Sequence, residues 1–142
     1  MFRKRSVRAL AGGLIVILLL ITASAAYAAV SGTFKGKTSQ KQSISFHVGR
    51  GKLTKMRFSL LLKCPSGHIY VGHVQVFAAI KIHKTNGFLV KLTSSSSPTQ
   101  DELLVSGRVS KTKVMGKLAE HRKVIKENAF CSGRTTFTAN KQ

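Results

Sequence analysis

Acidic residues are scarce in this sequence. Its 142 residues include 24 Lys and Arg but only four Asp and Glu, and the net charge is +20. The acidic residues are Asp101, Glu102, Glu120 and Glu127. Four acidic residues are few for an enzyme that hydrolyses with paired carboxylates, and few for a metal site built from carboxylates. We expect neither a metal nor a cofactor.

Motifs of the common enzyme classes are missing as well. The sequence contains no phosphate-binding G-x-x-x-x-G-K-[ST] loop, no dinucleotide-binding G-x-G-x-x-G and no G-x-S-x-G nucleophile turn. The five histidines, which show no metal-ligand spacing, are His47, His68, His73, His83 and His121. We therefore expect a protein without enzymatic activity.

The N-terminal segment has the three parts of a secretory signal peptide. Residues 1–8 contain four basic residues, residues 9–21 are apolar, and Ala26-Tyr27-Ala28 forms a small-residue cleavage site. We predict a signal peptide over residues 1–28, with cleavage after Ala28 or, as the alternative, after Ala29. Without cleavage, the uncharged residues 9–33 are long enough to anchor the chain in a membrane.

The remaining residues 29–142 are predicted to form one domain, which suits a length of about 114 residues. Removal of the signal peptide takes away four basic residues and no acidic one, which leaves a net charge of +16. The excess positive charge therefore belongs to the domain itself.

Cys64 and Cys131 are the only cysteines. An even number of cysteines in an exported chain favours a disulfide. The bridge would close a loop of about 67 residues and contribute about 4 kcal/mol in the chain-entropy model. That is a large share of the roughly 5–15 kcal/mol that stabilise a typical domain.

Apolar and polar residues alternate along most of the domain, as is typical of half-buried β-strands. One such stretch places Met56, Phe58, Leu60, Leu62 and Cys64 on the same side. Leu53 has the opposite parity, and a β-bulge at Thr54-Lys55 would bring its side chain to the same side as the others. The pattern predicts an all-β fold, a single antiparallel β-sandwich or flattened barrel of about seven or eight strands.

Two hairpins can be given a register from their apolar residues. A loop at residues 110–113 pairs Val109 with Val114, Gly107 with Gly116, and Val105 with Leu118. A loop at residues 85–87 pairs Ile82 with Val90 and Ile80 with Leu92. Residues 94–99 are predicted to form a Ser-rich solvated loop. Residues 119–127 are compatible with a helix or with a continued edge strand.

The ordered set of short motifs resembles small exported two-cysteine β-domain proteins of high-GC Gram-positive bacteria, which have no assigned activity. The motifs are Gly32-Thr33-Phe34-Lys35-Gly36-Lys37-Thr38-Ser39-Gln40, Ile44-Ser45-Phe46, Cys64, Asn86-Gly87-Phe88, Val105-Ser106-Gly107, Gly116-Lys117-Leu118 and Cys131-Ser132-Gly133. The resemblance implies a signal peptide, a β-domain and pairing of the two cysteines. It implies no catalytic residues.

Positive charge is the most unusual feature of the domain, because a surface of this charge attracts polyanions. The candidate polyanion surface consists of Arg57, Lys63, Lys111, Lys113, Lys117, Arg122 and Lys123. We expect no specific nucleic-acid recognition, since few aromatic residues are left for stacking on bases.

The predicted function is that of a non-catalytic binding module, secreted or located at the exterior of the cell envelope. Anionic cell-wall polymers and anionic lipid surfaces are its candidate partners, and the protein is expected to be a monomer. One alternative is a carrier of a small apolar ligand between the sheets, for which Gly72, Gly107 and Gly116 could leave room. A second alternative is an enzyme of unknown type.

Overall fold

A computed structural model describes residues 30–94 and 101–142 of the chain. The signal peptide expected at residues 1–28 and most of the Ser-rich loop expected at residues 94–99 lie outside the described residues. The described chain is built almost entirely of β-strands, with one short 3-10 helix. The elements are β1 (Gly32–Thr38), β2 (Ser43–Gly49), β3 (Lys52–Lys63), β4 (Ile69–Val76), β5 (Ile80–Lys81), β6 (Gly87–Thr93), β7 (Glu102–Val109), β8 (Lys113–Val124), η1 (Ile125–Glu127) and β9 (Ala129–Lys141).

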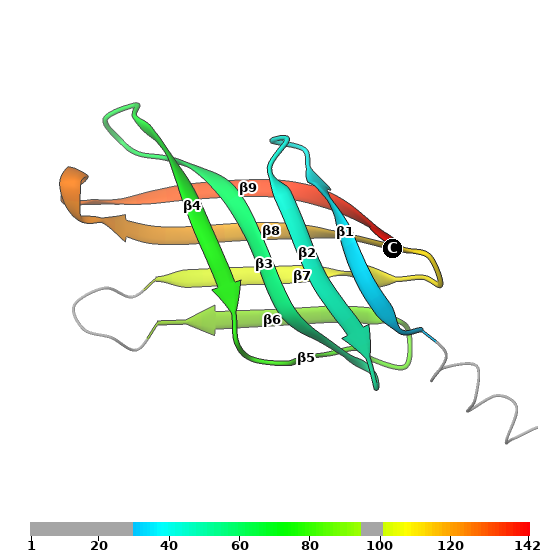
Figure 1. The fold of residues 1–142 in the computed structure, drawn as a ribbon. Coiled ribbons are helices and arrows are strands. Elements are labelled where there is room, and N and C mark those ends of the chain that lie inside the picture. Colours follow the sequence, from blue (N-terminus) through cyan, green and yellow to red (C-terminus); the bar gives the residue numbers. More distant parts are fainter. Residues whose placement is uncertain (1–29, 95–100) are drawn as a thin grey trace, which may run out of the picture.

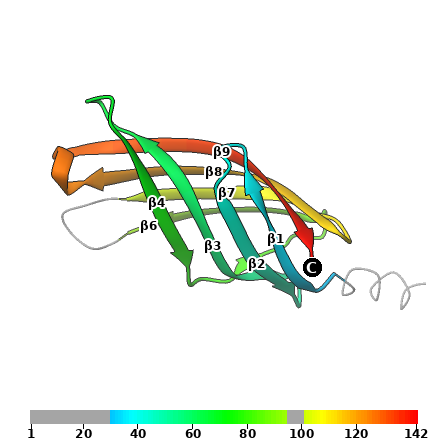
Figure 2. The same ribbon diagram turned by 45° about the horizontal axis from the view of Figure 1, so that its top comes forward.

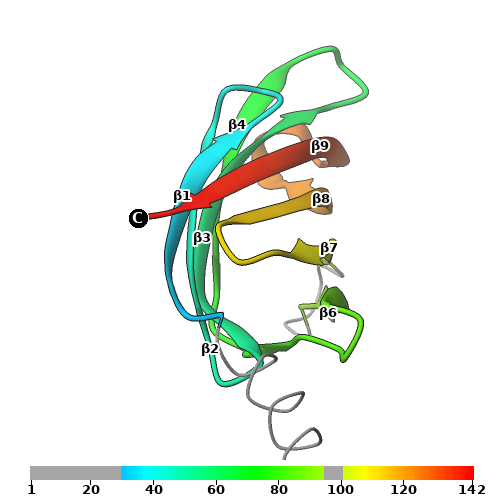
Figure 3. The same ribbon diagram turned by 90° about the vertical axis from the view of Figure 1, so that its right-hand side faces the viewer.

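The strands form one antiparallel sheet that folds into two layers. Their order is β4-β3-β2-β1-β9-β8-β7-β6, and the two-residue strand β5 lies off this path and pairs with β3. Strands β1–β4 make one layer and β6–β9 the other; the layers cross in Figures 1 and 2 and face each other in Figure 3. Strand β1 joins them, because it pairs with β2 on one side and with β9 on the other. The predicted β-sandwich or flattened barrel is confirmed.

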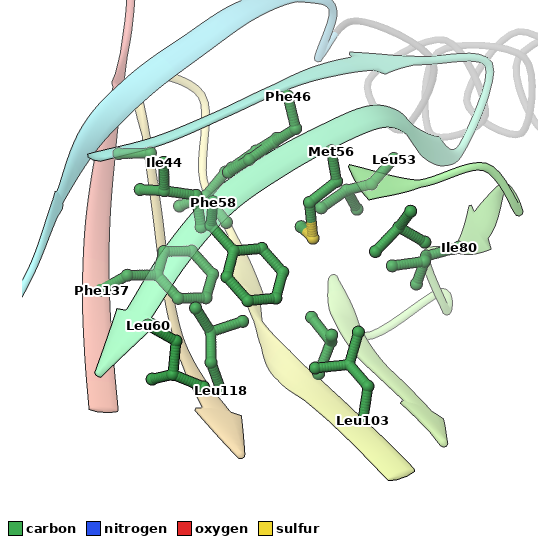
Figure 4. Close-up of a cluster of buried hydrophobic side chains, with 14 of the residues drawn as sticks. Ile44, Phe46, Leu53, Met56, Phe58, Leu60, Ile80, Leu103, Leu118 and Phe137 are labelled. Atoms are coloured by element: carbon green, nitrogen blue, oxygen red, sulfur yellow. The ribbon is translucent and has the colours of Figure 1, made fainter. Parts of the chain in front are cut away.

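The inner faces of the two layers enclose one hydrophobic core. Alternate residues of each strand are buried, among them Phe34 of β1 and Phe46 of β2. The ring of Phe46 stacks on Phe34 at 5.8 Å between centroids and makes a T-shaped contact with the Phe137 ring at 6.1 Å. Figure 4 shows Phe58 of β3 facing Leu118 and Phe137 of the other layer. Because the polar partners of this alternation point outward, each layer has its own solvent-exposed face.

The predicted β-bulge in β3 is confirmed. Ser45 pairs with Arg57 and His47 with Thr54, so β3 contains one residue more than β2 between these two pairs. Lys55 takes up the extra residue with a φ of 53°. As a result Leu53 is buried together with Met56, although the two have opposite parities.

The hairpin of β7 and β8 has the predicted register, with Val105 opposite Leu118 and Val109 opposite Val114. Its two glycines, Gly107 and Gly116, form the centre of a row of paired residues that crosses β6, β7, β8 and β9.

In this row Phe88 lies opposite Gly107, Gly107 opposite Gly116, and Gly116 opposite Phe137. A Cβ atom would approach the Phe88 ring to 2.6 Å at Gly107, and the Phe137 ring to 2.6 Å at Gly116. The two glycines thus allow aromatic rings from the flanking strands to lie directly over the sheet.

The predicted pairing of Ile82 with Val90 is wrong. Ile80 pairs with Leu53 of β3, whereas Val90 pairs with Val105 of β7. Strand β5 lies where the chain passes from the first layer to the second, so the buried Ile80 and the following Ile82 close the corner of the core. Alternation correctly indicated which side of the segment is buried, but it carries no information about which strand lies alongside.

The sequence of residues 119–127 is compatible with a helix or an edge strand, and most of these residues form a strand. Strand β8 continues to Val124, and only Ile125–Glu127 form a single 3-10 turn. The strand is not at an edge, because β8 lies between β7 and β9. Asp101 directly precedes β7, and its carboxylate accepts a hydrogen bond from the Lys123 backbone N–H at 3.0 Å.

The predicted disulfide between Cys64 and Cys131 is present and joins the layers at the end of β3. Next to it, Lys63 of β3 pairs with Ser132 of β9. The side chain of Gln40 fills the fork where the two strands diverge: its Oε1 accepts a hydrogen bond from the Leu61 N–H at 2.8 Å. A disulfide is compatible with an oxidising compartment outside the cytosol.

Candidate functional site

The seven residues of the candidate polyanion surface do not lie on one face. Arg57 and Lys63 point outward from β3 in the first layer. Lys113, Lys117 and Lys123 point outward from β8 in the second layer, and Lys111 lies in the β7–β8 turn. Arg122 is half-buried and forms an ion pair with Glu120.

The acidic residues are divided very unevenly between the two layers. All four follow residue 100, whereas residues 30–84, which hold β1 to β5, contain ten basic residues and no acidic one. The uneven distribution of acidic residues is visible in the sequence, but only the fold shows that the acid-free segment forms one complete layer.

The outside of this first layer is therefore a surface without carboxylates, which we call the acid-free face. Its polar members are the outward residues of β1 to β4, namely Thr33, Lys35, Lys37, Ser43, Ser45, His47, Lys52, Thr54, Lys55, Arg57, Ser59, Lys63, His73 and Gln75. Six of the fourteen are Lys or Arg, and the others offer hydroxyl, imidazole and amide groups. A positive field and hydrogen-bond donors thus coincide on this face.

Strand pairing sets the spacing of these side chains. Lys35, Ser45 and Arg57 lie in one row across β1, β2 and β3, and Gln75 of β4 continues the row. Neighbouring strands are about 4.8 Å apart, so the backbones of Lys35 and Arg57 are about 10 Å apart. Lys37 lies two residues along the same strand as Lys35, at a distance of about 7 Å. The cations form a flat array rather than a single pocket.

Arg57 lies where two hollows of this face meet. One hollow, of about 560 Å³, includes Ser43, Ser59 and His73 in its lining. The other has the same volume and includes Lys35, His47 and Lys55 in its lining. Ser45, Arg57 and Gln75 line both hollows. A guanidinium group at such a junction can donate a pair of hydrogen bonds to a phosphate or a carboxylate.

The cations of the acid-free face are not neutralised within the protein. In the part of the chain that the structure describes, the ion pairs are His68–Glu127, Lys91–Glu102 and Arg122–Glu120. None of them includes a residue of the acid-free face. Its positive charges are therefore available to an external anion.

The acid-free face also carries a serine and a histidine in contact. The Ser59 Oγ and His73 Nδ1 atoms are 2.8 Å apart on paired strands. A second pair, Ser132 and His121, has the same geometry at 2.7 Å on the other layer. A catalytic triad requires a carboxylate that orients the histidine. Among the described residues neither His73 nor His121 is bonded to one, so both pairs act as cross-strand hydrogen bonds.

The most deeply buried carboxylate belongs to Glu120, which is 6% exposed and points into the core from β8. Its Oε1 accepts a hydrogen bond from the Arg122 guanidinium at 2.5 Å, and within the described chain its Oε2 has no partner. Burial raises the pKa of Glu120, and the Arg122 guanidinium opposes this shift. Gly72 lies opposite: a Cβ at that position would come within 3.3 Å of Oε2. The glycine thus leaves space for the carboxylate.

The three glycines considered for an apolar carrier do not open a common space. Rings of Phe88 and Phe137 lie over Gly107 and Gly116, and Gly72 faces Leu62 and the Glu120 carboxylate.

The described residues contain no cluster of three or more His, Cys, Asp or Glu side chains suited to a metal ion. They also contain no helix with the length and apolar character of a membrane span. No protein-family model, no curated protein and no solved structure matches the chain. Its function therefore has to be inferred from its own surfaces.

Proposed function

We propose that the protein is an exported, non-catalytic module that binds an anionic polymer on the acid-free face. The observation that carries the proposal is the presence of six basic side chains without an ion-pair partner in the described chain, on a sheet face without a carboxylate. An anion that approaches this face meets no acidic side chain of β1 to β5, because all four acidic residues follow residue 100.

The flat arrangement favours a polymer over a small anion. Side chains spaced by about 7 Å along a strand and about 10 Å across strands can contact successive charges of an extended chain. A rigid sheet holds them in place, so the polymer does not have to order a flexible loop when it binds. The serine hydroxyls between the cations add hydrogen bonds to the anionic groups.

Export is the second part of the proposal. It is supported by the charged start, apolar middle and small-residue end of residues 1–28 and by the disulfide, which is compatible with an oxidising compartment. Outside the cell, phosphate-rich wall polymers are the partners whose charge complements this face. We take poly(glycerol phosphate) as the probe.

The test compares two charge-reversal variants with the same change in net charge. One carries Lys35→Glu, Lys37→Glu and Arg57→Glu on the acid-free face; the matched control carries Arg108→Glu, Lys113→Glu and Lys117→Glu on the outside of the second layer. Binding of poly(glycerol phosphate) is measured by titration at several salt concentrations, and chemical unfolding verifies that both variants are folded.

We expect the first variant to bind at least tenfold more weakly and to show a weaker salt dependence. Every phosphate that the variant no longer neutralises reduces the slope of log affinity against log salt by about 0.7, as in single-stranded nucleic acids. The control should retain most of its affinity. Equal reductions in both variants would mean that only net charge matters, and the assignment to the acid-free face would then be wrong.

A further inference from the structure

Strand β4 forms one border of the first layer. It pairs with β3, and in the described chain no other strand lies against its second edge. Figures 1 and 2 both show β4 as the outermost strand of its layer. Its outer edge therefore presents backbone N–H and C=O groups that can pair with another strand.

This edge lacks the usual protection against pairing. Proteins commonly place lysine or proline on an edge strand, or keep it very short. Strand β4 has eight residues and no charged one. It lies in a run of 17 residues, 64–80, without Lys, Arg, Asp or Glu, the longest such run after residue 35. By contrast, β6 at the opposite border carries Lys91, which forms an ion pair with Glu102.

Large apolar side chains are exposed along the same segment. Ile69 is 63% exposed, Val71 is 49% exposed, and Phe77, directly after the strand, is 88% exposed. Ile69 and Val71 have the outward parity of β4, which Phe77 continues in sequence. In a chain with this excess of charge, such a segment is the part that a like-charged copy can approach with least repulsion.

The positions of these residues make the edge complementary to itself. If two β4 strands pair antiparallel about His73, residues 69 and 77 become opposite neighbours, as do residues 71 and 75. Each Phe77 then lies next to Ile69 of the second copy, and Val71 lies opposite Gln75. Because the pairing has two-fold symmetry, the contact between Phe77 and Ile69 occurs twice, once at each end of the paired segment.

We propose that two copies of this chain pair through β4, antiparallel and centred on His73, and so continue the β1–β4 layer from one copy into the other. The inference departs from the monomer expected from the sequence. It is independent of the polymer proposal, but it has a consequence for it, because the dimer would join two acid-free faces into one surface. A polymer that spans both would bind with a higher apparent affinity than to either alone.

The test is sedimentation equilibrium of the purified, disulfide-bonded protein over about 1 to 500 µM, a range suited to a weak edge-to-edge interface. We expect a concentration-dependent dimer. Val71→Lys places a charge on the edge and should raise the dimer dissociation constant at least tenfold. Leu89→Lys, at an exposed outward position of β6, is the matched control and should leave the dimer unchanged.

A second variant tests the register. With the axis at His73, two copies of His73→Cys bring their thiols together, so mild oxidation should give a covalent dimer. Leu89→Cys should form no covalent dimer under the same conditions. A wild-type protein that is monomeric at the highest concentration, or a dimer that survives Val71→Lys, would overturn the proposal. Neither readout involves polymer, so failure here leaves the function of the acid-free face a separate question.

Discussion

On the outside of the β1–β4 layer every charged residue is basic, whereas the outside of the β6–β9 layer mixes cations with Glu102. Both layers expose apolar side chains, Ile69 and Val71 in the first and Leu89, Leu104 and Met115 in the second. The two layers nevertheless share one core and one alternating pattern. Burial therefore constrains only the inward-facing side chains of each strand, and the outward-facing side chains can differ between the layers.

The difference also concerns how each layer uses its charges. Lys91 and Glu102 of the second layer compensate each other at 3.2 Å, and Arg122 compensates the buried Glu120. In the first layer no carboxylate is present to do this. The six like charges on this face repel one another, so they do not stabilise the fold.

The largest expected effect comes from separating the layers where they are covalently joined. Replacing both cysteines by alanine should lower the free energy of unfolding by about 4 kcal/mol, because the open chain regains the entropy of a long loop. Urea denaturation of the variant and the oxidised wild type measures the difference. A decrease below about 1 kcal/mol would show that the fork at Gln40 and the β3–β9 pairing hold the layers together without the bridge.

A smaller effect is expected from crowding the row of rings in the second layer. Gly116→Ala puts a methyl group against the Phe137 ring and the Ser106 carbonyl, so we expect the free energy of unfolding to fall by about 2–3 kcal/mol. Gly49→Ala in the first layer is the control, because its methyl group would meet only the movable His47 ring at 3.2 Å. It should cost less than about 1 kcal/mol in the same denaturation experiment. Similar decreases at both glycines would contradict the role of close ring packing.

The residues of these experiments also show what the sequence could reveal. The pairing of Gly107 with Gly116 was predictable because two neighbouring apolar pairs share its register and the turn is short. The outward direction of Arg57 and Lys117 was predictable from alternation in their own strands. The sequence did not reveal that Arg57 and Lys117 belong to opposite faces. The layer of each strand depends on β1 pairing with β9, which lies about 100 residues away. Likewise, nothing in the alternation of Ile80 and Ile82 distinguishes β3 from β6 as their neighbour.

Two carboxylates near the ends of the layers should respond to pH in opposite ways. Hydrogen bonds from Tyr70, Ser66 and His68 lower the pKa of Glu127 to about 2. Its unfolded value is about 4.3, so its contribution to stability is present above that pH and is lost as the pH falls toward 2. Glu127→Gln should therefore destabilise the protein at pH 6, and the difference from wild type should shrink toward pH 2. Thermal unfolding across this range measures it.

Glu120 provides the contrasting case. Burial raises its pKa, so the folded protein holds the proton more tightly than the unfolded chain does. Stability from this group is present at low pH and is lost as the pH rises through the raised value. Compared with wild type, Glu120→Gln should therefore gain stability as the pH rises from 4 to 7. A parallel pH course for both variants would show that their environments do not differ in this way.

The smallest expected effect tests the two faces directly through single lysines. Lys35→Gln removes one of six like charges and breaks no ion pair, so it should raise stability slightly, by at most about 0.5 kcal/mol. Lys91→Gln breaks the exposed pair with Glu102 and should lower stability by a similar amount. Salt screens exposed charges, so both differences should fade between low and high ionic strength. Precise denaturation curves at two salt concentrations measure the signs, and equal signs for the two variants would mean that the layers do not differ in how they balance charge.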